Sequence, residues 1–411
     1  MSPRFAGNFN QKTQMARLAL LCAAVCAPAA FAADLPTLIR DAVSADPAVL
    51  EARASEDVAE SRLNATRAQH WPVLGVQAGS NVVNPSKYYS TPFRGVTGRM
   101  NVYSAGAIDA AVERDGFRHE YQQFKTEETR EQVAYNVASY YLQALAAKEQ
   151  LDAQKLNLSR HEKIIGDLDI VVANDPGRRY ELVQAQSRAL QVRMSMVQFE
   201  KIMNLALSRL TRYTTQKPTL SNPVAADWEA ALPPETLNRD HPGLQALRRE
   251  AESVRRDQDH LAKSRWPRID VEAGAGNHSY VRLVANWNFF DRSADYTVDS
   301  AAKQIIASER RGELAQRELA EQADTARADM AQSQLQIKAA EQQIGASTEV
   351  AKLYEMQFKV GRRSLIELVN AYAELSSVET SRVVAENAWR AAVVNYLHAR
   401  AALADWAQAP R

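Results

Sequence analysis

The chain has 411 residues, and its 50 basic side chains nearly balance its 49 acidic ones. This balance argues against a nucleic-acid-binding protein that is held by a strongly basic surface. The two cysteines, Cys22 and Cys26, both lie within residues 1–32. The sequence that follows therefore has no disulfide framework, zinc–thiolate site or cysteine nucleophile.

The N-terminus has the three parts of a secretory signal peptide. Basic residues come first, an apolar stretch covers residues 18–25, and Ala30-Phe31-Ala32 forms a cleavage pattern. The apolar stretch is shorter than the ~20 residues that span a bilayer, which argues against a transmembrane anchor. We therefore predict that residues 1–32 are a signal peptide and that the mature protein is exported.

The remaining sequence carries the same ordered signals twice. An Asp46-Pro47 pair corresponds to His241-Pro242, and each opens a stretch that ends in Trp-Pro. Further on, residues 181–185 (Glu-Leu-Val-Gln-Ala) correspond to residues 367–371 (Glu-Leu-Val-Asn-Ala). Matches in the same order predict a duplicated unit of about 190 residues. The expected organisation is a first repeat at 33–217, a Pro-rich linker at 218–240, a second repeat at 241–405 and a short tail at 406–411.

After each Trp-Pro the hydrophobic pattern changes from helical spacing to alternation. In the second copy, Ile269 and Val271 alternate with Asp270 and Glu272, and residues 276–279 supply a turn. The pattern predicts β-hairpins at 73–104 and 268–290. Strands of about ten residues with one apolar face are typical of membrane barrels. A soluble antiparallel sheet that packs on one face has the same pattern, and the hairpins alone favour it.

Two stretches, residues 105–173 and 293–359, are polar and contain no proline. Each would form a helix about 100 Å long at 1.5 Å per residue, which implies coiled-coil packing. Shorter helices are expected at 37–70, 180–212, 242–265 and 364–404. In each copy, the two shorter helices together have about the length of the long helix, so they could stack end to end beside it.

Four strands cannot close a membrane barrel, because about eight is the lower limit. Open sheet edges are not tolerated in lipid. A chain whose hairpins span a membrane must therefore form oligomers. Eight strands fill their own interior with side chains, so a conducting pore favours a trimer or a larger assembly.

Each long helix is followed by a turn, a basic pair and a carboxylate. Pro176 and Gly177 precede the first basic pair, and Gly361 precedes the second. We expect each glycine to adopt the left-handed turn conformation. The carboxylates, Glu181 and Glu367, could pair with basic residues within or between subunits. They could also simply complement the dipole at a helix start.

Taken together, these features resemble the TolC-like outer membrane efflux proteins over about residues 35–405. The resemblance rests on the duplicated His/Asp-Pro start, the Trp-Pro before the strands, Phe290-Asp291 after them, and residues 358–371. It implies a mainly α fold with a small β part, in which long coiled-coil helices are joined to two β-hairpins. The hairpins would form a trimeric, 12-stranded transmembrane β-barrel.

The resemblance also implies location and partners. The chain would be an outer membrane channel-tunnel of a Gram-negative cell that exports solutes or proteins. It would belong to a tripartite efflux or type I secretion system. Its partners would be two further copies, a periplasmic adaptor (membrane fusion) protein, an inner-membrane pump (ABC or proton-driven) and outer membrane lipid.

Roles at the periplasmic end of the tunnel follow from the same resemblance. Glu367 matches the first of two constriction acids, and Asn370 stands where the second would be. Arg363 matches a basic residue that bridges to the acid matched by Glu181, and Phe358 matches an aromatic constriction residue. Gln184 is a further gating candidate, and the tips that would dock the adaptor contain Gly177, Arg178, Gly361 and Arg362. A Glu367 ring would favour cations.

The sequence argues against an enzyme. None of the seven histidines falls in an HExxH spacing, and there is no P-loop, G-x-S-x-G or complete G-x-G-x-x-G. We therefore predict no catalytic residues, cofactor, metal site or nucleic-acid partner. The alternative to a channel is a soluble periplasmic coiled-coil adaptor or structural protein.

Overall fold

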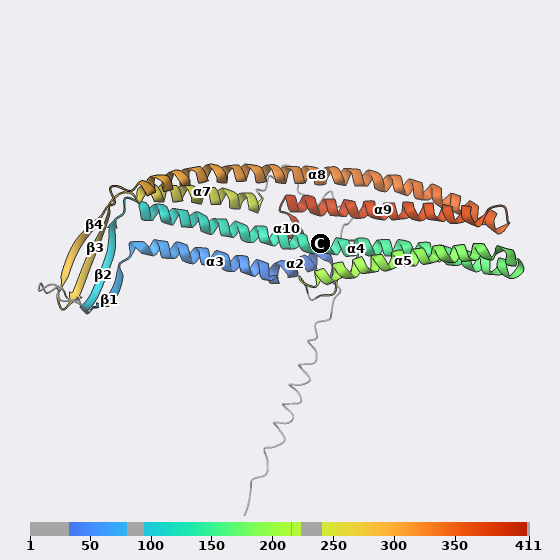
Figure 1. The fold of residues 1–411 in the computed structure, drawn as a ribbon, viewed down its shortest axis with the longest axis horizontal. Helices are drawn as coiled ribbons and strands as arrows, with labels where there is room; N and C mark the ends of the chain where they lie inside the picture. Colours follow the sequence, from blue (N-terminus) through green and yellow to red (C-terminus); the bar gives the residue numbers. More distant parts are fainter. Residues whose placement is uncertain (1–32, 80–93, 215, 223–240, 409–411) are drawn as a thin grey trace, which may run out of the picture.

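The computed structural model of the chain describes residues 33–79, 94–214, 216–222 and 241–408. The predicted signal peptide and most of the predicted linker lie outside these residues. The described part is a long rod of helices with a small antiparallel sheet at one end (Figure 1). The predicted mainly α fold with a small β part is confirmed.

Two helices run the length of the rod, α4 (Ala107–Asn174) and α8 (Arg292–Lys359), with 68 residues each. The shorter helices lie beside them in pairs (Figure 1): α3 (Pro47–Arg67) and α5 (Arg179–Leu210) follow α4, and α7 (Pro242–Lys263) and α9 (Leu365–Ala399) lie between α4 and α8. The predicted end-to-end stacking is therefore confirmed. No helix in the described ranges is both long enough and apolar enough to cross a membrane.

Two helices that the sequence predicted as continuous are broken. The first divides into α2 (Leu35–Ala45) and α3, because the Asp46 carboxylate accepts a hydrogen bond from the Ala48 N–H at 2.8 Å and caps α3. Pro47 favours the same start, since it fits the first turn of a helix. The last helix ends at Ala399, and α10 (Leu403–Gln408) follows a turn in which Ala401 has a φ of 50°.

The strands form one four-stranded sheet in the order β1-β2-β3-β4, with all neighbours antiparallel. Their bounds are β1 (Val73–Ala78), β2 (Arg94–Tyr103), β3 (Arg268–Gly276) and β4 (Tyr280–Asn286). Both predicted hairpins are present, although β4 ends before the predicted boundary at residue 290. There the Trp287 indole N–H donates to the Arg265 carbonyl at 3.1 Å, beside the end of α7.

The two hairpins join through β2 and β3, a pairing that the sequence did not predict. Val96 lies opposite Ala275, and Gly95 lies opposite Gly276. A Cβ on Gly95 would lie 2.2 Å from the Ala275 carbonyl oxygen, so only glycine fits this close approach. The pairing leaves β1 and β4 as the outer strands of the sheet within one chain.

The best-packed core lies at the middle of the rod. Leu38 and Ile39 of α2 are fully buried there against α4, α9 and α10. Tyr141 of α4 is also fully buried, and its hydroxyl lies within hydrogen-bond distance of the Thr219 and Ser221 carbonyls, at 2.6 and 2.9 Å, and accepts from the Ser221 N–H at 3.1 Å. These bonds attach the segment after α5 to the rod. A second core lies near the end away from the sheet, between the α4–α5 and α8–α9 hairpins.

Candidate functional site

The first helical tip is the turn between α4 and α5. Asp175 ends α4, and its carboxylate accepts a hydrogen bond from the Gly177 N–H at 3.1 Å. Pro176 opens a short 3₁₀ turn that leads into α5. Gly177 has no positive φ, so the predicted left-handed turn is wrong at this tip. The Asp175 cap and the fixed φ of Pro176 close the turn without it.

The second helical tip is the turn between α8 and α9. Gly361 has a φ of 73°, so the predicted left-handed turn is confirmed here. Ser364 caps α9, and the Glu367 carboxylate accepts hydrogen bonds from the Ser364 N–H at 3.0 Å and the Ser364 hydroxyl at 2.9 Å. This reciprocal capping box stabilises the start of the helix.

Each tip carboxylate pairs with an arginine of its own tip. Arg178 donates to both Glu181 oxygens, at 3.0 and 2.8 Å. Arg363 forms an ion pair with Glu367 one helical turn away and lies 4.3 Å from the centre of the Tyr354 ring. The hydrogen bonds from Ser364 and then the contact with Arg363 lower the pKa of Glu367. Within one chain both tip acids thus pair locally, and the Arg363–Glu181 bridge implied by the family resemblance stays a prediction.

The other predicted gating residues differ in exposure. Phe358 is only 8% exposed and packs in the core between the two helical hairpins. Its ring therefore contributes to packing between the hairpins in one chain, and its role in a constriction stays a prediction. Asn370 and Gln184 are exposed, as are the docking candidates Gly177, Gly361 and Arg362, whereas Arg178 is half-buried.

The two tips carry more positive than negative charge. Arg179 and Arg362 are exposed and form no ion pair with any residue of the described part. The tip acids Glu181 and Glu367 are already paired with arginines. The described tip surface therefore carries more positive than negative charge, and the cation-favouring Glu367 ring stays a prediction.

Ion pairs that the sequence analysis missed join the two helical hairpins away from the tips. Arg160 of α4 donates to both oxygens of Glu379 of α9. Glu149 of α4 accepts from Arg390 of α9 at 2.7 Å, and Arg390 is 5% exposed. More than two hundred residues separate each pair in the sequence. No local pattern could have indicated them.

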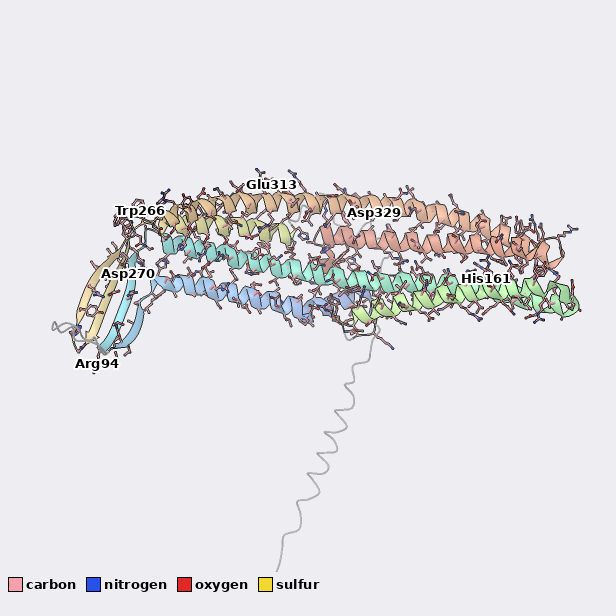
Figure 2. The ribbon with its side chains drawn as sticks, in the orientation of Figure 1. Arg94, His161, Trp266, Asp270, Glu313 and Asp329 are labelled. Carbon is pink, nitrogen blue, oxygen red and sulfur yellow. The ribbon has the colours of Figure 1, made fainter. Side chains whose placement is uncertain are left out.

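The sheet end has one polar and one apolar face. Glu272 of β3 pairs with Arg99 of β2 and Arg282 of β4, both at 2.7 Å, on the polar face. On the other face Val76 is 85% exposed and Leu283 is 72% exposed, so nothing in the described chain covers these side chains. Trp266 lies where the helices meet the sheet (Figure 2). An apolar band beside interfacial aromatic residues is the pattern of a membrane-barrel strand.

In the described part of the chain, no group of three or more His, Cys, Asp or Glu side chains is placed to hold a metal ion. Glu181, Glu367 and Glu272 instead take part in ion pairs with arginines. The arrangement thus offers a sheet with one polar face, a helical rod and two basic tips.

Known proteins resemble the chain in part of its sequence and in its fold. Residues 38–216 match the family described as outer membrane efflux protein. The outer-membrane channel OprN is 16% identical, with 90% of each chain covered and a TM-score of 0.79. VceC from Vibrio cholerae is 14% identical, with 89% of this chain and 96% of that chain covered and a TM-score of 0.79. The CmeC channel of Campylobacter jejuni is 13% identical, with coverages of 90% and 85% and a TM-score of 0.78.

The comparison with curated protein sequences finds no match. The solved structures share the fold over nearly all of both chains, and their low identities limit that likeness to the fold. The family match runs from within α2 to just past the end of α5 and so lies in the predicted first repeat. Residues 38–216 thus match the outer membrane efflux protein family, and the chain as a whole has the fold of the outer-membrane channels OprN, VceC and CmeC.

Proposed function

We propose that three copies of the chain form one channel, in which twelve strands make a β-barrel in the outer membrane and the helices continue it as a periplasmic tunnel. The observation that carries this proposal is the four-stranded sheet with an uncovered apolar face and a polar face held by Glu272, Arg99 and Arg282. Lipid would cover the apolar face, and the polar face would line the pore.

The free edges of the sheet support assembly. β1 and β4 are the outer strands, and an unpaired strand edge is costly in lipid because its N–H and C=O groups have no partner. Pairing β1 of one copy with β4 of the next removes every edge when the ring closes. Twelve strands leave a lumen, whereas a barrel of about eight is filled by its own side chains.

The rod supplies the route across the periplasm. At 1.5 Å per residue, α4 and α8 are each about 100 Å long. Solutes or proteins would pass through a preformed conduit, without chemistry in this chain, in a tripartite efflux or type I secretion system. The basic tips, with Arg178, Arg179 and Arg362, would face the periplasmic adaptor, and an ABC or proton-driven pump would supply the energy.

Gating would occur at the tips by a shift of the α8–α9 hairpin relative to the α4–α5 hairpin. Glu367, Asn370 and Gln184 stay our candidates for the constriction, because all three lie near the tips and are not buried. The Arg160–Glu379 pair lies across the moving boundary. We propose that this ion pair acts as a latch, meaning that it must separate before the α8–α9 hairpin can shift. The Arg363–Glu181 bridge implied by the resemblance would be a second such contact.

A soluble periplasmic adaptor is the alternative function. Long paired helices suit that class equally well, but a sheet whose apolar side chains are uncovered does not suit a soluble protein. Cell fractionation separates the two. A channel requires detergent for extraction and migrates differently on gels before and after heating. Recovery in the soluble periplasmic fraction, with no heat-dependent change in migration, would support the adaptor instead.

A further inference from the structure

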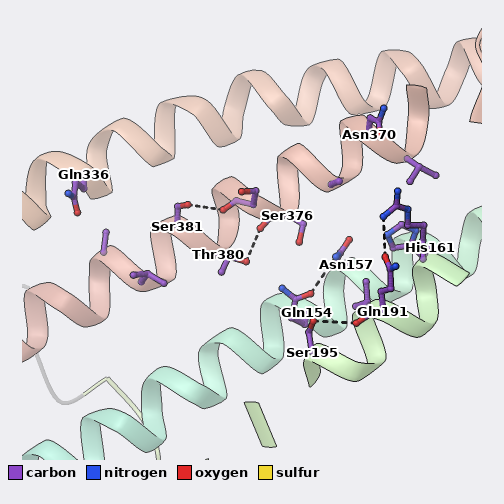
Figure 3. Close-up of a pocket in the computed structure, with 17 residues that line it drawn as sticks. Gln154, Asn157, His161, Gln191, Ser195, Gln336, Asn370, Ser376, Thr380 and Ser381 are labelled. Carbon is purple, nitrogen blue, oxygen red and sulfur yellow. Dashed lines mark hydrogen bonds between the residues drawn. The ribbon is translucent and has the colours of Figure 1, made fainter. Parts of the chain in front are cut away.

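A pocket with a volume of about 670 Å³ lies between α4, α5 and α9 (Figure 3). Its lining consists mostly of amide and hydroxyl side chains, among them Gln154, Ser195, Asn370 and Ser377. Small apolar side chains, such as Val192, also contribute. Such a mixture suits an organic molecule that has both a polar group and a hydrocarbon part.

Among the described residues, Arg188 is the only charged side chain that lines the pocket, and none of the lining residues is a carboxylate. Arg188 donates to the neutral Gln191 amide oxygen at 3.1 Å, so its positive charge is not balanced there. Arg193, farther along α5, instead pairs with Glu162 at 2.9 Å. Asn370 also lines the pocket, at the position where the family resemblance implied a second acid. An acid there would add negative charge to the pocket, whereas the Asn370 amide is neutral.

Two buried polar groups in the wall of the pocket have no partner. His161 is 3% exposed and its Nδ1 atom makes no hydrogen bond, and Asn157 is 6% exposed with an unpartnered Oδ1 atom. Burial, followed by the charge of Arg188, lowers the pKa of His161, so its imidazole is neutral at pH 7. An unsatisfied buried polar atom destabilises the folded state, so two of them in one wall point to a ligand that would satisfy them.

We propose that this pocket is a binding subsite for an organic monocarboxylate. The carboxylate would pair with the Arg188 guanidinium, whose planar fork matches two carboxylate oxygens. A single positive charge balances one carboxylate better than a doubly charged phosphate. The inference rests on the proposed function only in that the bound molecule would be cargo in the tunnel.

Binding can be measured on the detergent-solubilised full-length protein by saturation-transfer NMR. The probe is 4-hydroxybenzoate, and the uncharged 4-hydroxybenzamide is the matched control. Arg188→Gln should weaken binding of the benzoate about tenfold. Asn370→Asp should weaken it similarly, because the new carboxylate would balance Arg188. The control Arg193→Gln removes the same charge from the same helix outside the pocket and should change binding less than twofold.

Equal binding of the benzoate and the benzamide would overturn the proposal, as would equal effects of Arg188→Gln and Arg193→Gln or no binding by the wild type. Circular dichroism of each variant verifies that loss of binding does not reflect loss of folding. The outcome is separable from the channel proposal, because fractionation and heat-dependent migration do not depend on this pocket.

Discussion

Arg160 of α4 and Glu379 of α9 form a two-pronged ion pair, at 2.7 and 2.6 Å, between helices from the two halves of the chain. Both side chains are mostly buried, with 18% and 17% of their surface exposed. Water therefore screens the pair less than it screens an ion pair on the surface. The pair ties the α8–α9 hairpin to the α4–α5 hairpin at the boundary where an iris-like opening would occur.

Glu379→Gln should loosen this boundary. The change leaves Arg160 without its charged partner and should destabilise hairpin packing by about 2 kcal/mol. In planar bilayers, the variant should show higher conductance in the resting channel than the wild type. Glu162→Gln is the matched control, since Glu162 pairs with Arg193 on an exposed surface. Equal conductance in all three proteins would contradict the latch role.

The two faces of β1 provide a paired test of membrane insertion. Val76 lies on the exposed apolar face, and Gln77 next to it points to the polar face. Val76→Arg should reduce the outer membrane fraction sharply, because arginine on the lipid face costs about 2–4 kcal/mol near the bilayer midplane. Gln77→Arg should insert normally. If both variants insert equally well, the assignment of the lipid face is wrong.

We expect the charges of the tip residues to influence the ion selectivity of the channel. Glu367→Gln removes an acid that is paired with Arg363, so the reversal potential under a salt gradient should move towards anion preference. Arg362→Gln removes an arginine that forms no ion pair within the described chain, and it should move the potential towards cation preference. The two shifts should have opposite signs. Shifts of the same sign, or none, would show that the tips do not border the conduction path.

We expect Glu131 to make the docking of α10 depend on pH. Its carboxylate is buried and accepts the Leu403 and Ala404 N–H groups at 3.1 and 3.2 Å. Burial raises the pKa of Glu131 from 4.5 to about 7. Because the folded state then holds the proton more tightly than the unfolded state, stability should fall by up to about 3 kcal/mol as pH rises from about 4.5 to about 7.

Hydrogen exchange of residues 403–408, corrected for intrinsic rates, measures this effect. Protection in the wild type should be lower at pH 8 than at pH 5. Glu131→Gln cannot ionise, so its protection should be nearly the same at both values. A wild type without this difference, or a variant that keeps it, would show that Glu131 does not control the docking.

The helices and hairpins could be predicted because their signals are local. Long stretches without proline set the lengths of α4 and α8, and alternation after each Trp-Pro marked the strands. The break at Asp46-Pro47 also had a local signal, since a capping carboxylate preceded a proline. The pairing of β2 with β3 had none, because it depends on how two distant hairpins meet.

The contrast between local signals and contacts of distant segments also decides which parts of the candidate site could be predicted. Arg178–Glu181 and Arg363–Glu367 have the spacing of neighbours on one helix face, so the sequence contained these local pairs. The family resemblance implies in addition a bridge between Arg363 and Glu181, which stays a prediction. Burial of Phe358 and pairing of Arg160 with Glu379 depend on packing between segments about two hundred residues apart, and one sequence carries no record of that contact.

The most direct test of the central claim is the single-channel conductance of the purified full-length protein in planar lipid bilayers. An outer membrane export channel should insert as trimers and give discrete, long-lived conductance steps of uniform size. Folded, purified protein that produces no such steps under any applied voltage would contradict the channel and support a soluble periplasmic role.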